Sequence, residues 1–255
     1  MLSKATSQIR GRHFSIGMAM CALVAQVGWA SSAWSDMAPY PKMAPLAEYL
    51  SADPASEIAL ARSAAPAVIS DKAEILVLGA HGYETVVKGT NGFVCYVGRS
   101  WEADLDHPEF WNPKIRAPTC ANAAAVRSHM PYYKELTQWV LAGVSQDEMI
   151  ARTKAEIAVG KIKAPEPGAM ALMLSKDQYV GDNQGGPSGG QFYPHVMFWG
   201  PPGPASDWGA NLKGSPILSQ PSDIMPLTMY YIPIRKWSDG SLYPYPAPSQ
   251  PEPTQ

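Results

Sequence analysis

Residues 192–199 form a short extended segment that carries the histidine best placed to do chemistry. Alternation along a strand puts Tyr193, His195 and Trp199 on one face, together with Met197. Both faces of the segment are largely apolar, so we expect the strand to lie inside a sheet. An imidazole at such a position either makes a structural hydrogen bond or faces a functional partner, and both alternatives stay open.

A loop that follows this segment supplies further polar and aromatic groups. Asp207 carries a carboxylate, Trp208 an indole and Asn211 an amide. If the loop folds over the ends of the strands, it would complete a pocket with aromatic walls and a few polar groups, which is typical of a small-molecule or sugar site. The alternative is that the tryptophans simply fill the core. The predicted ligand-binding residues are Tyr193, His195, Trp199, Asp207, Trp208 and Asn211.

The densest group of potential metal ligands lies between Asp104 and Glu109. Asp104, Asp106, His107 and Glu109 could hold a hard cation through their carboxylates, or a transition metal if a second histidine came close. The spacing differs from that of an EF-hand loop, and a solvated acidic loop is the better interpretation of the pattern. The sequence therefore predicts no metal site and no cofactor.

Residues 186–190 match the G-x-S-x-G pattern of serine hydrolases, with Ser188 at the nucleophile position. That motif needs a buried strand before the serine and a helix after it, because the sharp turn between them exposes the hydroxyl. Here a polar, glycine-rich run precedes the motif and a predicted strand follows it. We therefore expect a loop, and the sequence assigns no catalytic residue.

Cys95 and Cys120 are the two cysteines outside the N-terminal leader. Neither has a second cysteine or a histidine at metal-ligand spacing. In an oxidising compartment the two are expected to form a disulfide, which would stabilise the fold by roughly 3–4 kcal/mol in the chain-entropy model. A pair of buried free thiols is the alternative.

The N-terminus predicts export. Residues 1–13 carry several basic and no acidic side chains, and residues 14–30 carry no charge. This order is typical of a secretory signal peptide, with small residues at Ala30 and Ala33 for the peptidase, and we assign residues 1–33 to it. A retained membrane anchor is disfavoured because a bilayer span needs about 20 apolar residues. We therefore expect a periplasmic or extracellular protein without stable membrane insertion.

The overall composition excludes further classes. The chain has 255 residues, of which 16% are charged and 46% hydrophobic, and a formal net charge of −2. Low charge argues against intrinsic disorder, and the absence of a basic excess argues against nucleic acid as a partner.

The pattern of elements predicts an α+β fold, with an antiparallel sheet of about six strands and helices packed on one face. Residues 34–243 are expected to form a single domain, and residues 244–255 a proline-rich flexible tail. The expected strands are 73–78, 83–87, 93–99, 169–175, 191–199 and 227–237, with helices starting at 54, 121, 131 and 145.

Six stretches of the chain carry a family resemblance. They are SEIALARSAAPA (56–67), GYETVVKGTNGFVC (82–95), WNPKIRAP (111–118), PHVMFW (194–199), WGAN (208–211) and WSDG (237–240). Together they resemble an exported bacterial family known only as hypothetical proteins. The resemblance covers most of the mature chain and implies an exported bacterial protein, but it transfers no activity and no catalytic residue.

These features favour an exported, non-catalytic protein that binds a small ligand or associates with the cell envelope. No nucleophile, base and orienting residue occur at convincing spacing. The alternative is a periplasmic hydrolase, with or without a metal ion, that uses His195 with Asp207 or the Asp104–Glu109 cluster as general acid and base. A third option is a structural protein that joins a larger assembly through its proline-rich end. The sequence assigns neither an enzyme activity nor an oligomeric state.

Overall fold

The computed structural model describes residues 39–184, 186 and 188–244. The predicted signal peptide and nearly all of the proline-rich tail lie outside the described residues. Within these ranges, no helix combines the length and the apolar character that a membrane-spanning segment requires.

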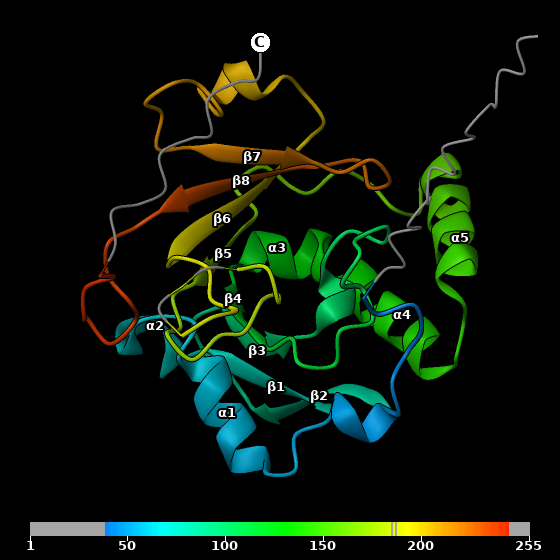
Figure 1. Cartoon of the computed structure of the whole chain (residues 1–255), viewed down its shortest axis with the longest axis horizontal. Helices are drawn as coiled ribbons and strands as arrows, with labels where there is room; N and C mark the ends of the chain where they lie inside the picture. The colour runs from blue at the N-terminus through cyan, green and yellow to red at the C-terminus, as the bar shows by residue number, and fades with distance from the viewer. Residues whose placement is uncertain (1–38, 185, 187, 245–255) are drawn as a thin grey trace, which may run out of the picture. The chain divides into compact units, whose positions relative to one another are not determined.

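An eight-stranded mixed sheet forms the centre of the described part, with strand order β2-β1-β3-β4-β5-β6-β8-β7 (Figure 1). β1 and β3 are parallel, and every other neighbouring pair is antiparallel. The predicted α+β class is confirmed, but the sheet is larger than expected and is not wholly antiparallel. The strands are β1 (Glu74–Gly79), β2 (Gly82–Val87), β3 (Val94–Gly98), β4 (Ala117–Ala121), β5 (Met170–Met173), β6 (His195–Gly200), β7 (Leu218–Pro221) and β8 (Thr228–Pro233).

The parallel pair arises because the chain crosses β1 after leaving β2. β3 therefore lies on the far side of β1, where Ile75 pairs with Cys95. Gly89 permits this crossing, since a Cβ atom there would lie 2.2 Å from the backbone nitrogen of Glu74. The sequence suggested an antiparallel sheet, which would contain no such parallel pair.

The two additional strands, β4 and β7, have weak strand signatures. β4 contains Pro118, which normally argues against a central strand because proline cannot donate a ladder hydrogen bond. It is tolerated here because β5 pairs only with Cys120 and Ala121, so β4 lacks a β5 partner at Pro118. β7 is a four-residue edge strand that ends in Pro221.

Helices cover both faces of the sheet, whereas the sequence suggested one. Each residue of β3 and β4 is buried, so both faces of these strands need cover. One helix packs on β1, β3 and β4, and another pair packs on the opposite face against β2, β4 and β5. The helices are α1 (Pro54–Arg62), α2 (Ala67–Ser70), α3 (Ala123–Ser128), α4 (Met130–Leu141) and α5 (Gln146–Ala158), with one-turn 3₁₀ segments η1 (Leu46–Glu48), η2 (Ser100–Glu102) and η3 (Ala205–Trp208).

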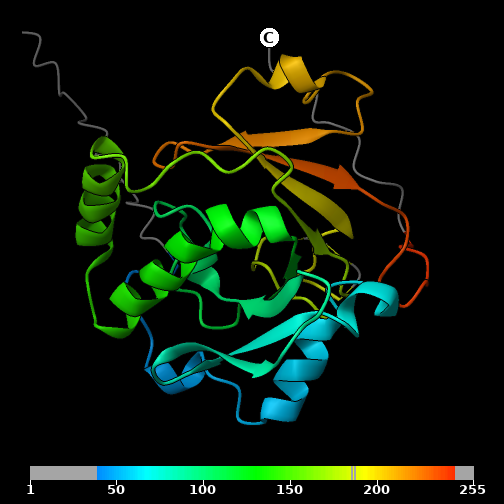
Figure 2. The same ribbon diagram turned by 180° about the vertical axis from the view of Figure 1, so that it is seen from behind.

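The sheet curves around α3 and α4. Both views place this helix pair between the β1–β2 end and the β6–β8 end of the sheet (Figures 1 and 2). The larger core lies on this side and includes Tyr96 of β3, Trp199 of β6 and Leu136 of α4. α5 joins it, with the Tyr132 hydroxyl 3.1 Å from Thr153 Oγ1.

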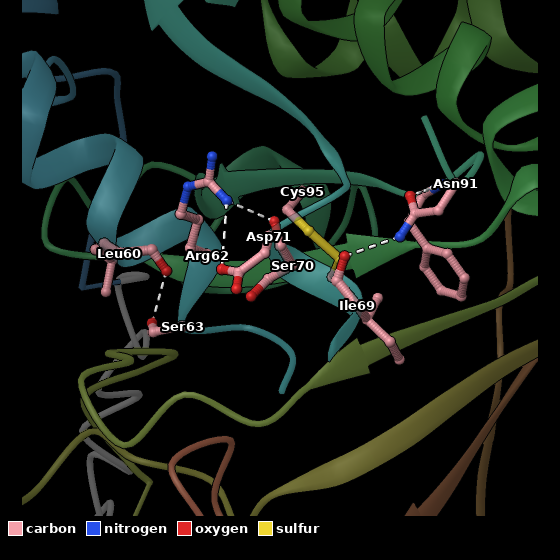
Figure 3. The surroundings of a disulfide bond; sticks show 10 residues. Leu60, Arg62, Ser63, Ile69, Ser70, Asp71, Asn91 and Cys95 are labelled. Atoms are coloured by element: carbon pink, nitrogen blue, oxygen red, sulfur yellow. Dashed lines mark hydrogen bonds and ion pairs between the residues drawn. A yellow bond between two sulfur atoms is a disulfide. The ribbon is translucent and has the colours of Figure 1, made fainter. Parts of the chain in front are cut away.

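The smaller core lies under α1 and contains the disulfide. Cys95 and Cys120 face each other directly across β3 and β4, are fully buried, and form the expected bond. Figure 3 shows the surrounding segment, in which Asn91 Nδ2 donates to the Ile69 carbonyl at 2.8 Å and Arg62 donates to the Ser70 carbonyl at 2.7 Å. These contacts tie α1 and α2 to the turn that precedes β3.

Candidate functional site

A cavity of about 270 Å³ lies between the sheet and the α3–α4 pair. The sheet forms one wall and α4 another, while the segment 99–107 after β3 forms a third side. Part of the 180–184 loop also contributes to the lining.

Strand register explains why the sheet wall is built of these side chains. Residues two apart on one strand, and residues directly opposite on neighbouring strands, share a face. His195 pairs with Met173, Met197 with Tyr231, and Trp199 with Met229. These six residues of β5, β6 and β8 all line the cavity: Met173, His195, Met197, Trp199, Met229 and Tyr231.

His195 is the buried polar group at the centre of this wall, with 2% exposure. Its Nδ1 lies 2.9 Å from the Tyr193 carbonyl oxygen. Because a carbonyl only accepts, Nδ1 carries the proton and Nε2 is left with its lone pair. No other hydrogen bond to this ring occurs among the described residues. Burial lowers the pKa of His195 to about 4, so the ring is neutral and offers an acceptor.

His129 joins α3 to α4 and faces the same cavity. Its ring stacks on the indole of Trp199, with centroids 4.5 Å apart and planes 24° apart. Burial lowers the pKa of His129 to about 4. Both cavity imidazoles are therefore uncharged at neutral pH.

Two carboxylates line the side formed by segment 99–107. Glu102 accepts a hydrogen bond from the Tyr96 hydroxyl through Oε1, but its Oε2 is buried without a hydrogen-bond partner in the described part of the chain. Burial raises the pKa of Glu102 to about 7. Asp104 accepts from Ser222 Oγ at 2.6 Å and more weakly from Gln220 at 3.4 Å. Burial raises the pKa of Asp104 as well.

Ser100 adds a second unsatisfied oxygen next to Glu102. The residue has 1% exposure, and its Oγ has no hydrogen-bond partner among residues 39–184, 186 and 188–244. Most buried polar atoms in proteins are hydrogen-bonded. Two unsatisfied oxygens on one short 3₁₀ segment that lines a cavity are therefore a feature that a bound molecule would explain.

Arg99 lines the cavity but has its hydrogen bonds satisfied by protein groups. Its Nη2 lies 2.7 Å from Glu57 Oε1, and Nε donates to the Tyr49 carbonyl at 2.6 Å. Its backbone N–H donates to the hydroxyl of Tyr133, on α4, at 3.1 Å. The guanidinium therefore fixes segment 99–107 in place and leaves little capacity for a ligand.

The predicted ligand-binding residues divide into two groups in space. His195 and Trp199 line the cavity. Tyr193 is buried beside it, and its carbonyl orients His195. Trp208 stacks instead on Tyr230 at 4.5 Å, on the face of β8 opposite to Tyr231.

Asp207 and Asn211 lie with Trp208 and away from His195. Asp207 belongs to η3 beside Trp208, and its charge raises the pKa of Tyr230 as a minor addition to burial. Asn211 exchanges hydrogen bonds with Ser219 of β7, at 2.9 Å from the Ser219 nitrogen. The connection after β6 thus packs along the β7–β8 edge rather than over the cavity, so the predicted six-residue pocket does not form as one unit.

The Asp104–Glu109 cluster is also dispersed. His107 Nδ1 accepts the Glu109 N–H at 3.1 Å, while Asp106 is exposed. Glu109 is buried rather than solvated, and accepts from Asn112 at 2.6 Å and from the amide of Asp182. The described residues contain no group of three or more histidine, cysteine, aspartate or glutamate side chains arranged to hold a metal ion. Ser188 is exposed in the 180–190 loop.

The sequence patterns did not single out Glu102, Ser100 or His129. Each lies just outside a regular element, either in the turn after β3 or between two helices. A carboxylate two residues before Asp104 and a histidine at a helix junction were visible signals, but their burial depends on segments distant in sequence: α4 packs on η2, and Trp199 of β6 stacks on His129.

Comparisons with protein-family models, curated proteins and solved structures found no match to this chain.

Proposed function

We propose that the protein binds a small organic molecule in the cavity between the sheet and α3–α4. The observation that carries this proposal is His195, a nearly fully buried imidazole whose Nδ1 bonds to the backbone while Nε2 has no described partner. Nε2 is therefore free to accept a hydrogen bond from a molecule in the cavity. A ligand with an O–H or N–H group would supply the donor.

The lining supports a ligand about the size of one or two rings. A volume of about 270 Å³ lies near the lower end of the range for small-molecule sites, roughly 300–1,000 Å³. Aromatic side chains from four elements face it, including Trp101 of η2, Tyr132 of α4, Trp199 of β6 and Tyr231 of β8. Flat rings stack well on such walls, and flexible methionines adapt to their edges.

We further propose that binding takes place outside the cytoplasm, in the periplasm or in association with the envelope. The basic and then apolar N-terminal residues support export. The buried Cys95–Cys120 disulfide is compatible with an oxidising compartment.

A hydrolase that pairs His195 with Asp207 is less favoured. The two residues belong to groups that pack on different faces of the β6–β8 region. Catalysis by general acid and base requires both groups within hydrogen-bond reach of one substrate.

The binding proposal is tested with a panel of one- and two-ring fragments, screened by ligand-observed NMR against the wild-type protein. Met197→Trp fills the cavity from β6, and His195→Phe keeps the ring but removes the acceptor. Val86→Trp, at an exposed position on β2, is the matched control. Near-ultraviolet circular dichroism checks that each variant is folded.

We expect fragments that bind the wild type and Val86→Trp to lose binding to Met197→Trp. Hydroxyl-bearing fragments should bind His195→Phe about fivefold to tenfold more weakly, because one neutral hydrogen bond is lost. Binding that survives in both Met197→Trp and His195→Phe, or a wild type that binds no fragment, would overturn the proposal.

A further inference from the structure

The charged groups around the cavity do not balance. Arg99 is neutralised by Glu57 at 2.7 Å, and both side chains are buried. Glu102 and Asp104 form no ion pair with a lysine or arginine among the described residues. His129 contributes no positive charge at neutral pH because burial lowers its pKa to about 4. The cavity is therefore acidic along the side formed by η2 and the residues after it.

The acidic side also contains two of the six buried side-chain oxygens that lack a hydrogen-bond partner among the described residues. Glu102 Oε2 and Ser100 Oγ are both buried and both lack a hydrogen-bond donor in the described structure. A carboxylate that loses water without gaining a counter-charge is strongly disfavoured. A ligand that brings a positive charge and N–H donors would supply the counter-charge that this side of the cavity lacks.

Aromatic side chains surround these carboxylates. The Tyr96 hydroxyl donates a hydrogen bond to Glu102, and Tyr132, Tyr133 and Tyr231 line the same cavity as the two carboxylates. The faces of aromatic rings attract cations, and more strongly where water is excluded. Carboxylates and ring faces therefore attract a cation together and repel an anion.

We infer that the ligand of this cavity is a primary or secondary organic amine of about one ring in size, bound as its ammonium cation with its nitrogen on the side of the cavity that Glu102 and Asp104 line. This inference rests on the proposed binding function and adds the chemical class of the ligand. An ionised carboxylate only accepts hydrogen bonds, so an ammonium that carries N–H groups suits this side of the cavity better than a quaternary ammonium, which has none.

Benzylamine and benzyl alcohol make a matched pair of probes, since they differ mainly in the charge of one polar group. Isothermal titration calorimetry at about pH 8 compares the two with the wild type. We expect benzylamine to bind about tenfold more tightly or better, as charge-assisted hydrogen bonds are stronger than neutral ones. Benzoate should not bind measurably.

Glu102→Gln keeps the shape of the side chain and removes its charge. It should reduce the preference for benzylamine over benzyl alcohol to about twofold or less. Ser100→Ala, a small change that does not remove charge, should weaken benzylamine binding by about threefold to tenfold. Asp106→Asn is the matched control, because Asp106 is exposed and does not line the cavity.

The results separate the two proposals. If benzyl alcohol binds as tightly as benzylamine and Met197→Trp abolishes both, the cavity binds small molecules and the amine inference is wrong. An amine preference that persists in both Glu102→Gln and Ser100→Ala also overturns it. If neither probe nor any fragment binds the wild type, the binding function itself fails.

Discussion

Arg99 and Glu57 form a buried ion pair, with Nη2 2.7 Å from Oε1 and side-chain exposures of 0% and 2%. The pair connects α1, on one face of the sheet, to the segment that lines the cavity on the other. Carbonyl oxygens of Tyr49 and Val97 accept further hydrogen bonds from the guanidinium. A buried ion pair is tolerated when its remaining donors are satisfied in this way.

Glu57→Ala should destabilise the protein by about 3–5 kcal/mol, because it leaves the Arg99 charge buried without a partner. Urea unfolding measures the loss. Glu148→Ala removes an exposed carboxylate that pairs with Arg152 within α5, and should cost less than about 1 kcal/mol. If both variants lose the same free energy of unfolding, the buried Arg99–Glu57 pair contributes no more to stability than the exposed pair, and the prediction is wrong.

Removal of the disulfide should also lower stability. Cys95 and Cys120 are separated by 25 residues, and a loop of that length corresponds to about 3–4 kcal/mol in the chain-entropy model. The double variant Cys95→Ala/Cys120→Ala should therefore melt well below the wild type. Reductant should lower the melting temperature of the wild type and leave the melting temperature of the double variant unchanged. If reductant present during unfolding does not change the melting temperature of the wild type, the prediction is wrong.

Local patterns in the sequence anticipate much of the fold. Helices were expected to start at residues 54 and 145, and the side chains of Asp53 and Ser145 cap α1 and α5 there by accepting hydrogen bonds from amides two or three residues later. Strand alternation places His195, Met197 and Trp199 together along one wall. Both features depend only on residues close in the chain, which explains why the pattern suffices.

Local sequence patterns do not predict the features that depend on contacts between residues far apart in the chain. The parallel pairing of β3 with β1 depends on a crossing at Gly89, and the position of Trp208 depends on its stacking against Tyr230 rather than near His195. Glu102 becomes a buried carboxylate only because α4 and β3 enclose it. Nothing in its sequence neighbours distinguishes it from an exposed acid.

His129 and His195 should stay neutral down to about pH 5, because burial lowers both pKa values to about 4. Their unfolded-state pKa is near 6.5, so below that pH the unfolded chain binds protons that the folded protein excludes. Both groups thus cost stability as pH falls from about 6.5 to 4. Imidazole nitrogen shifts followed by NMR check the protonation states. Protonation of both rings above about pH 6 would contradict the prediction, and His195 should show the Nδ1–H tautomer throughout.

Glu102 should have the opposite effect on the pH dependence of stability. Burial raises its pKa from 4.5 to about 7, although the hydrogen bond from Tyr96 and the charge of Arg99 act in the other direction. Tyr83 and Tyr133 face it from β2 and α4, and their own pKa values are raised, so they stay neutral across this range.

The folded protein therefore holds the Glu102 proton more tightly than the unfolded chain does. As pH rises from about 4.5 to 7, the unfolded chain releases this proton first, and the free energy of unfolding falls by roughly 2–3 kcal/mol from this group. Glu102→Gln cannot ionise, so it should lose this dependence while keeping that of the histidines. Urea unfolding at about pH 5 and pH 8 provides the comparison. The free energy of unfolding of Glu102→Gln minus that of the wild type should be about 2 kcal/mol larger at pH 8 than at pH 5. An identical difference at both pH values would mean that Glu102 is ionised in the folded protein over the whole range, as an exposed carboxylate would be.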